Sequence, residues 1–171
     1  MMKKIVLFLL FSCLAVGTVS AQKVGFCNVQ LILQKMPEYQ VAQEKLNELA
    51  KEYKAEIQAK KDKIAELYGS YQADKILLSS EMRSKKEEEI KQNESELEKL
   101  RGARFGENGD LFTERQKLVR PLQDKVYEAI EEVADRKGYT LILDVSGNAS
   151  VLYYSEKYDC TEDVLKKMGY L

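Results

Sequence analysis

A narrow apolar stripe in the middle of the chain constrains the fold more than any other feature. Between Tyr39 and Tyr71 the apolar residues are three or four positions apart, and Glu, Lys and Gln fill most of the positions between them. Such spacing places the apolar side chains on one face of a helix. Because the stripe is as narrow as a coiled-coil seam, it predicts a long arm and not a helix that covers a globular core. Its members are Tyr39, Ala42, Leu46, Leu49, Tyr53, Ile57, Ile64, Leu67 and Tyr71.

A second stripe predicts that the arm folds back on itself. The chain is expected to reverse between residues 69 and 80, where Ser79 or Ser80 can cap a new helix. This helix should end at Gly138, because glycine favours the left-handed conformation that stops a helix. The two legs predict an antiparallel helical hairpin over residues 37–137. The returning stripe comprises Leu97, Leu100, Phe105, Leu111, Phe112, Leu118, Leu122, Val126, Ile130 and Val133.

Three glycines and one proline interrupt the returning leg. Gly102, Gly106 and Gly109 each cost about 1 kcal/mol relative to Ala inside a helix, so a loop is one interpretation. A kinked or frayed helix is favoured, because the spacing of the stripe continues across the glycines without a slip. Pro121 predicts a second kink. The returning leg is longer than the first, and kinks are one way to absorb the surplus.

The two ends of the chain change to the period of β-strands. Residues 23–29 alternate as a short strand, and residues 139–145 alternate with Leu141 and Leu143 on one side. After turn residues at 146–148, residues 149–155 are expected to form another strand and to complete a hairpin.

A last short helix is expected after Asp159, with Glu162 three residues later completing a capping box. The order of strand, two long helices, two strands and helix predicts an α+β fold that is mostly helical. It consists of a long antiparallel helical hairpin, or coiled-coil arm, over residues 37–137. This arm stands on a small three-stranded β base formed by residues 22–36 and 138–171.

The predicted base is too small to be stable alone. Three strands leave two open edges, and open edges pair with other strands. Closing the strands of several copies into a barrel removes these edges. We therefore expect the base to associate, although this reasoning fixes no copy number. The residues expected at the contact are Val24, Phe26, Leu141, Leu143, Val151 and Tyr153.

The first 21 residues have the three-part pattern of a secretory signal peptide. A basic start at Lys3 and Lys4 is followed by an apolar run that is short for a membrane span, and small residues precede position 22. We expect cleavage after Ala21 and export of the rest of the chain. Lipid attachment at Cys13 is the alternative, because Leu-Phe-Ser-Cys at 10–13 resembles a lipobox.

Composition excludes several classes of function. The chain has no histidine, so it offers neither a zinc site of the usual kind nor a base that activates a nucleophile. No catalytic residue, metal or cofactor is expected. The net charge is −1, and a chain without a basic face is not expected to bind nucleic acid. Cys27 and Cys160 both belong to the base, where they either pair in a disulfide or remain buried free thiols.

Three segments carry a resemblance to a known family. They read Lys-Val-Gly-Phe-Cys-Asn-Val at 23–29, Gly-Tyr-Thr-Leu-Ile-Leu-Asp-Val at 138–145 and Asp-Cys-Thr-Glu-Asp-Val-Leu-Lys-Lys at 159–167. With the long charged hairpin, they resemble the Skp/OmpH family of periplasmic chaperones over residues 22–171. The resemblance implies a homotrimer in which strands of three copies form one barrel and three arms enclose unfolded outer-membrane proteins. It implies no ATP and no cofactor. The best-known members are strongly basic, whereas this chain is mildly acidic, so electrostatic capture of acidic clients or anionic lipid is not expected.

We expect the far part of the arm to meet clients. Tyr39 and Tyr53 have seam spacing and are expected to pack inside the hairpin. Residues 83–96 contain a single apolar residue, so they form either a flexible client-facing segment or a solvated helix face with i,i+4 pairs. The candidate client-facing residues are Tyr68, Tyr71, Ile76 and Ile90.

The sequence thus predicts a periplasmic, ATP-independent holdase chaperone that binds unfolded outer-membrane proteins and prevents their aggregation. Contact with a membrane is not required. The alternative is a structural coiled-coil spacer or adaptor of the cell envelope, which explains leader, arm and base without a client. A spacer gains from a continuous seam, whereas a chaperone gains from an arm that flexes. The polar composition of residues 83–96 favours the chaperone.

Overall fold

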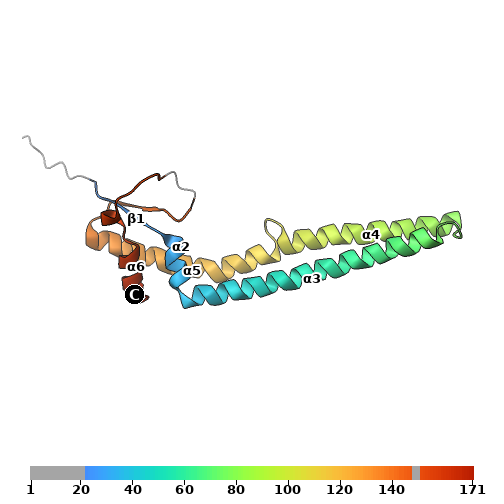
Figure 1. Ribbon diagram of the computed structural model, residues 1–171, viewed down its shortest axis with the longest axis horizontal. Coiled ribbons are helices and arrows are strands. Elements are labelled where there is room, and N and C mark those ends of the chain that lie inside the picture. Colours follow the sequence, from blue (N-terminus) through green and yellow to red (C-terminus); the bar gives the residue numbers. More distant parts are fainter. Residues whose placement is uncertain (1–21, 148–150) are drawn as a thin grey trace, which may run out of the picture.

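A computed structural model describes residues 22–147 and 151–171. It shows a long helical hairpin with a small base at one end (Figure 1). The predicted signal peptide lies outside the described residues. Within the described part, no helix is both long and apolar enough to cross a membrane. The elements in chain order are β1 (Val24–Cys27), α2 (Val29–Lys35), α3 (Pro37–Asp74), α4 (Ser80–Phe105), α5 (Asp110–Lys137), β2 (Leu141–Asp144), the 3-10 helix η1 (Glu156–Tyr158) and α6 (Thr161–Met168).

Helix α3 forms one leg of the arm, and α4 with the first part of α5 forms the other (Figure 1). Pro37 begins α3, where its missing N–H removes no helical hydrogen bond. At 1.5 Å per residue, the 38 residues of α3 span about 57 Å. The chain reverses at residues 75–79, and the Ser79 hydroxyl accepts a 3.2 Å hydrogen bond from the Met82 N–H. The reversal therefore lies within the predicted interval.

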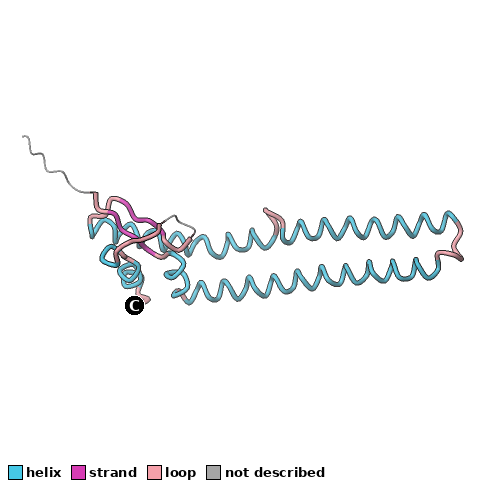
Figure 2. Tube along the Cα trace, turned by 45° about the horizontal axis from the view of Figure 1, so that its top comes forward, coloured by secondary structure: helices cyan, strands magenta, loops and turns pink. Residues whose placement is uncertain are grey.

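The returning leg is two helices, so the predicted continuous helix is wrong at residues 106–109. Helix α4 ends at Phe105 and α5 begins at Asp110, and the loop between them projects away from α3 (Figure 2). The backbone is crowded here, because a Cβ atom on Gly109 would lie 2.9 Å from the carbonyl oxygen of Ala103. Backbone hydrogen bonds from Gly106 to Gly102 and from Gly109 to Gly106 keep the loop short. Helices α4 and α5 therefore continue along the same side of α3, and the spacing of the apolar stripe did not reveal the loop.

The core of the molecule lies in the base, where α2, α6 and the last turns of α5 pack together. The sequence predicted no helix before Pro37, but Val29–Lys35 form α2, which begins where the Asn28 side chain accepts a 2.9 Å hydrogen bond from the Leu31 N–H. Helix α5 continues through Pro121 into this core. The surplus length of the returning leg therefore enters the base. The core residues are Cys27, Val29, Ile32, Leu33, Met36, Ala42, Leu122, Val126, Ala129, Val133, Cys160, Val164 and Leu165.

The sheet of the base has two parallel strands, β1 and β2, in the described part of the chain. Val24 pairs with Leu141 and Phe26 pairs with Leu143. In parallel strands, paired residues lie on the same side of the sheet. Ile142 packs against the core, and the four paired apolar residues lie on the opposite side.

The predicted strand hairpin is wrong over its described part. Residues 151–155 form no strand, and residues 148–150 lie outside the described residues. The segment is held to β1 by a side chain instead of a backbone ladder, because the Tyr154 ring stacks on the Phe26 ring with 4.9 Å between centroids. Alternation alone predicted a strand here, but residues 151–155 make no backbone ladder with β1 or β2.

The end of α5 matches its sequence signal, and the start of α6 matches only in part. Gly138 follows α5 with φ at 68°, in the left-handed region that was predicted. The Asp159 carboxylate accepts a 2.8 Å hydrogen bond from the Thr161 N–H at the start of α6. The predicted capping box does not form, because Glu162 pairs instead with Lys166 one turn later, at 3.4 Å.

Candidate functional site

The two legs of the arm meet along a seam of apolar side chains. In the middle of the arm, Ile57 and Ile64 of α3 are buried against Leu97 of α4, with Leu100 packed beside them. Full burial of an aliphatic side chain stabilises by about 1.5–3 kcal/mol. This small cluster is therefore the main apolar link between the legs in this region.

Tyr39 and Tyr53 are both partly buried, but of the two only Tyr53 packs between the legs as predicted. Tyr39 is partly buried against the core of the base. Tyr53 meets the Phe105 ring edge-on, with 6.0 Å between centroids, and the Arg104 guanidinium lies 4.6 Å from the Tyr53 centroid. Arg104 also pairs with Glu56 of α3 (2.9 Å) and with the first residue of α5, so it fixes the joint between α4 and α5.

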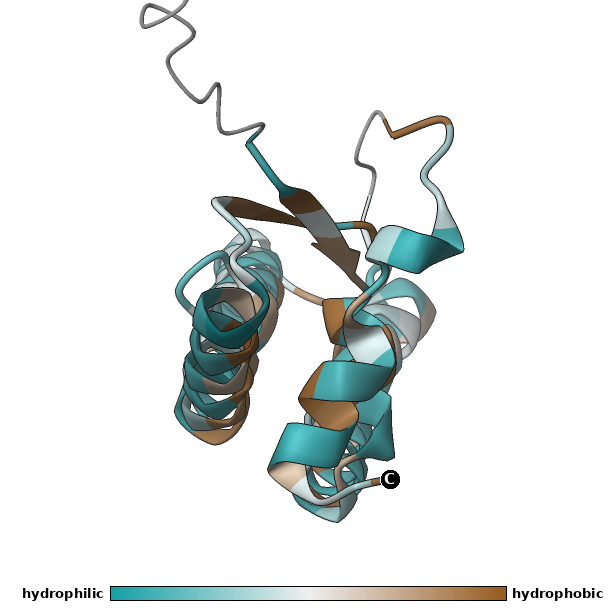
Figure 3. Ribbon diagram, turned by 90° about the vertical axis from the view of Figure 1, so that its left-hand side faces the viewer, coloured by the Kyte–Doolittle hydropathy of each residue, from teal (hydrophilic) through white to brown (hydrophobic). Residues whose placement is uncertain are grey.

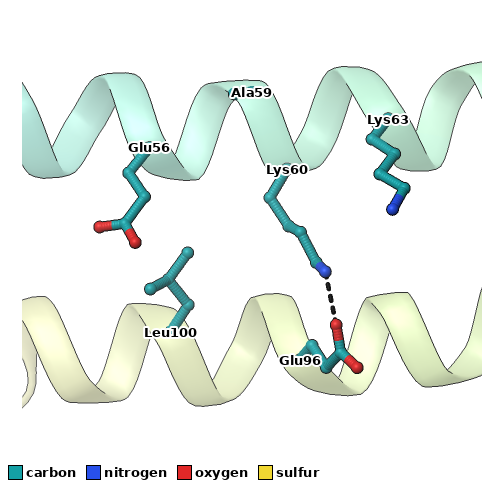
Figure 4. Close-up of a pocket in the computed structure, with 6 residues that line it drawn as sticks. All are labelled: Glu56, Ala59, Lys60, Lys63, Glu96 and Leu100. Carbon is teal, nitrogen blue, oxygen red and sulfur yellow. Dashed lines mark hydrogen bonds and ion pairs between the residues drawn. The ribbon is translucent and has the colours of Figure 1, made fainter.

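Charged side chains cross between the legs at the edge of the seam. Lys60 of α3 pairs with Glu96 of α4 (Figure 4), and Lys45 pairs with Glu114 at 2.8 Å. The hydrogen bond from the lysine is the main cause that lowers the pKa of Glu96 and of Glu114. Because these groups are exposed, solvent screens each pair and its contribution to stability is small.

A recess of about 520 Å³ lies between the legs where Lys60 takes a seam position. Figure 4 shows charged side chains around it and a single apolar one from α4. The apolar seam therefore has a gap at this point. The recess is lined by Glu56, Ala59, Lys60, Lys63, Glu96 and Leu100.

The seam is thinnest toward the tip of the arm. Over residues 83–96, the buried side chains of α4 are Ile90 and the polar Asn93. Asn93 donates a 2.8 Å hydrogen bond to the carbonyl oxygen of Glu89 in its own helix, so this donor does not link the legs. Tyr71 of α3 is buried opposite and donates a hydrogen bond to Glu87, which raises the pKa of the phenol.

Apolar side chains are exposed at the reversal of the chain. Ile76 is 93% exposed and Leu77 is 85% exposed, and Met82 in the first turn of α4 is about half exposed. We call these three residues the tip patch. The sequence singled out Ile76 alone. Leu77 and Met82 carried the same signal, since both are apolar residues beside the reversal that belong to neither stripe.

The four predicted client-facing residues divide into two pairs. Ile76 and Tyr68 are exposed, and the Tyr68 hydroxyl donates a 3.0 Å hydrogen bond to Glu94. Tyr71 and Ile90 are buried between the legs, because both fall on the seam spacing. These two side chains become available only when the legs separate.

The second apolar surface is the outer side of the β1–β2 sheet. Figure 3 shows the two strands lying across the helices of the base, with no helix over their outer side. Val24 and Phe26 are partly buried there, and Leu141 and Leu143 are exposed. We call these four residues the sheet face. Of the other two residues predicted at an oligomer contact, Val151 is partly buried and Tyr153 is 84% exposed.

The described residues of the arm and the base offer apolar and charged surfaces to a partner. The described residues contain no group of three His, Cys, Asp or Glu side chains that could hold a metal ion. The exposed features are the tip patch, the sheet face and the charged outer sides of the legs. An arm of this kind can hold a partner by apolar contact.

Comparison with known proteins assigns the family. The model of the family described as outer membrane protein (OmpH-like) matches residues 23–168. The chain belongs to the OmpH-like family. Among its OmpH-like relatives, the chaperone protein Skp of Vibrio cholerae serotype O1 is 31% identical over 166 residues, covering 91% of this chain and 88% of the relative. The chaperone protein Skp of Yersinia enterocolitica is 27% identical over 155 residues, covering 90% of each chain.

The OmpH-like fold is also shared with a solved structure. An OmpH-like protein from Caulobacter crescentus superposes with a TM-score of 0.64, covering 86% of this chain and 83% of that one. The two sequences are 12% identical, so this similarity concerns the fold alone. The family resemblance predicted from the terminal segments is confirmed.

Proposed function

We propose that this OmpH-like chain is a holdase chaperone that binds unfolded outer-membrane proteins without ATP and prevents their aggregation. One observation carries the proposal: apolar side chains are exposed at the end of a long arm whose distal seam is thin. Strands of outer-membrane barrels present a lipid-facing apolar side, which associates with other chains when it is unprotected in water. The Skp relatives, which are named chaperones, support this assignment.

The arm supplies two kinds of contact in this proposal. The tip patch offers apolar surface in the closed hairpin, next to the exposed ring of Tyr68. Separation of the legs adds Tyr71 and Ile90, which few neighbouring side chains hold in place. Few buried contacts give a low free energy of local opening, so a client can meet this second set without energy from a nucleotide.

Export belongs to the same proposal. The pattern of residues 1–21 predicts a signal peptide that is cleaved after Ala21, and this places the protein in the periplasm. Mass measurement of the protein isolated from cells should give a chain that begins at Gln22. A diacylglyceryl group on Cys13 would contradict this part of the proposal.

We further propose that the base associates into a homotrimer through the sheet face. The exposed part of the sheet face, Leu141 and Leu143, and an unpaired strand edge are both surfaces that a second copy can cover. The copy number of three is what the family resemblance implies.

Leu143→Asp places a charge in this contact, which is costly unless it is paired, so sedimentation should show dissociation. Tyr127→Asp, at an exposed position on α5, is the control and should leave the assembly intact. A wild-type chain that sediments as a monomer at micromolar concentration would contradict the assembly.

The holding function is tested by dilution of a urea-unfolded outer-membrane β-barrel protein into buffer, with light scattering as the measure of aggregation. Wild type should suppress the scattering, and Ile76→Ser with Leu77→Ser and Met82→Ser should weaken the suppression several-fold. Val41→Ser with Tyr127→Ser removes exposed apolar groups far from the tip and should match wild type.

Each outcome of this assay is informative. If the tip variant holds clients as well as wild type does, the tip patch is not the contact. If wild type suppresses aggregation of no unfolded barrel protein, the holdase proposal fails and the spacer or adaptor function replaces it.

A further inference from the structure

The two cysteines of the described chain lie beside each other in the base. Cys27 ends β1, and Cys160 directly precedes α6. Phe26 and Asp159 form an isolated parallel bridge, and the Cys160 N–H donates a 2.8 Å hydrogen bond to the Phe26 carbonyl oxygen. Each cysteine directly follows one member of the bridge, so the pairing of the backbones brings Cys27 and Cys160 together.

The spacing of this pairing suits a disulfide. Neighbouring extended chains lie about 4.7–4.9 Å apart, and disulfides join Cα atoms that are about 4.4–6.8 Å apart. The sulfurs also face one another. The Cys160 Sγ–H donates a 3.0 Å hydrogen bond to the Phe26 carbonyl oxygen, and the side chains of Cys27 and Cys160 are within hydrogen-bonding reach of each other. Formation of the bond therefore needs movement of the side chains and little movement of the backbone.

We infer that Cys27 and Cys160, which are free thiols in this structure, form an intramolecular disulfide when the chain folds under oxidising conditions. The inference rests on the proposed export in one respect, because export would bring the chain into an oxidising compartment. Its chemistry is a property of the folded base and is tested on the purified protein.

The two thiols shift each other's pKa in opposite directions. The hydrogen bond from Cys27 lowers the pKa of Cys160, whereas the hydrogen bond to Cys160 and burial raise the pKa of Cys27. The thiolate is the nucleophile in disulfide exchange. Cys27 and Cys160 are 1% and 0% exposed, so an oxidant reaches them during folding or when the base opens locally.

The reaction is a two-step exchange with a disulfide oxidant. The thiolate of one cysteine attacks one sulfur of the oxidant, forms a mixed disulfide and releases a thiolate that takes up the proton lost by that cysteine. The other cysteine then loses its proton and attacks the sulfur of the first, and the other half of the oxidant leaves as a thiol. The two cysteines lose two electrons and two protons, and one oxidant disulfide becomes two thiols.

The bond joins β1 to α6 and closes a loop that contains the whole arm. A disulfide that closes a loop this long strongly restricts the unfolded chain and so stabilises the folded one. Cys27 and Cys160 belong to the core side of the sheet, so the bond leaves the sheet face uncovered. The arm lies outside the contact, so its local opening stays the same.

The test uses the purified chain, unfolded in reductant and refolded in a mixture of oxidised and reduced glutathione. We expect both thiols to become unreactive, the mass to fall by two hydrogen atoms, and one disulfide-linked pair of peptides to contain Cys27 and Cys160. The midpoint of thermal unfolding should be roughly 10 °C higher for the oxidised than for the reduced protein.

The variant Cys27→Ala with Cys160→Ala is the control, and its midpoint should be the same in both buffers. If this variant fails to fold, the oxidised and reduced forms of wild type decide the question alone. Two reactive thiols in refolded wild type, or a disulfide between two copies, would overturn the inference. Suppression of client aggregation by the reduced protein is measured separately, so failure of the disulfide is distinguishable from failure of the holding function.

Discussion

The arm and the base are held together in different ways. The base buries one contiguous core drawn from β1, four helices and the segment before α6, and Ile32, Val126 and Val133 are fully buried in it. The distal arm relies on a thin seam and on exposed ion pairs. Helix α5 lies in the base and in the adjoining part of the arm, and α4 forms the distal part of the returning leg. The comparison predicts that regular helices of one chain differ widely in local stability.

The largest expected difference is in hydrogen exchange. Opening the distal arm breaks few apolar contacts, whereas opening residues 119–133 disrupts the core of the base. A difference of about 4 kcal/mol in opening free energy corresponds to about a thousandfold difference in protection. Amides of residues 81–96 should therefore exchange about a thousand times faster, relative to their intrinsic rates, than amides of residues 119–133. Equal protection in the two regions would remove the basis of the comparison.

A matched pair of substitutions probes the same contrast at single side chains. Ile32 in the base and Ile90 in the distal arm are both buried. Ile32→Ala should lower the free energy of unfolding by about 2–5 kcal/mol, because it leaves a cavity in a packed core. Ile90→Ala should lower it by about 1 kcal/mol or less, since its neighbours collapse or open to water. Urea unfolding measures both, and similar losses would show that the arm is as tightly packed as the base.

Filling the distal seam should make the arm behave more like the base. Lys86→Leu with Asn93→Leu adds two apolar side chains seven residues apart, in step with Ile90 and Leu97. Exchange of the distal amides should slow by roughly tenfold, and client holding should weaken if it needs an arm that opens.

Glu88→Leu with Ser95→Leu is the control for the filled seam. It has the same spacing and places leucine on the exposed side of α4. This variant should leave distal exchange near the wild-type rate. If the filled seam slows exchange but clients are held as well as before, opening of the arm is not part of the mechanism.

The smallest expected effect is that of pH on the arm. Glu96 and Glu114 have pKa values lowered below the ordinary 4.5 by hydrogen bonds from lysines of the other leg. A lowered pKa means that their contribution is present above pH 4.5 and is lost as the pH falls below it. Arm exchange, corrected for intrinsic rates, should rise slightly between pH 6 and pH 3.5. Lys60→Gln with Lys45→Gln should remove that rise.

Periodicity predicted the arm because the same spacing decides which side chains meet. Ile57, Ile64 and Leu97 pack as their positions in the two stripes indicated. The three glycines raised a loop as one interpretation of this region, but a continuous kinked helix was favoured, because a close approach of backbone atoms at residues 106–109 leaves no trace in the apolar spacing. Residues 149–155 alternate as a strand does, yet pairing depends on which edge is in reach, and that is a property of the assembled base.

The candidate site was predictable to a similar extent. Tyr71 and Ile90 were chosen for their apolar character, but the seam spacing that they share is also the reason that they are buried. Leu77 was overlooked, although an apolar residue at a chain reversal has no neighbour to bury it. The sheet face followed from alternation, whereas the contact between Cys27 and Cys160 needed the three-dimensional register of β1 beside residue 159.

The parallel pairing of β1 with β2 sets an order of events during synthesis. The first strand emerges from the ribosome long before its partner, and both legs of the arm lie between them. Local helical contacts form quickly, whereas the strand pairing and the docking of α6 wait for the end of the chain. We therefore expect a nascent copy to form its arm before its base, and its apolar sheet residues to stay unpaired until the C-terminus is released.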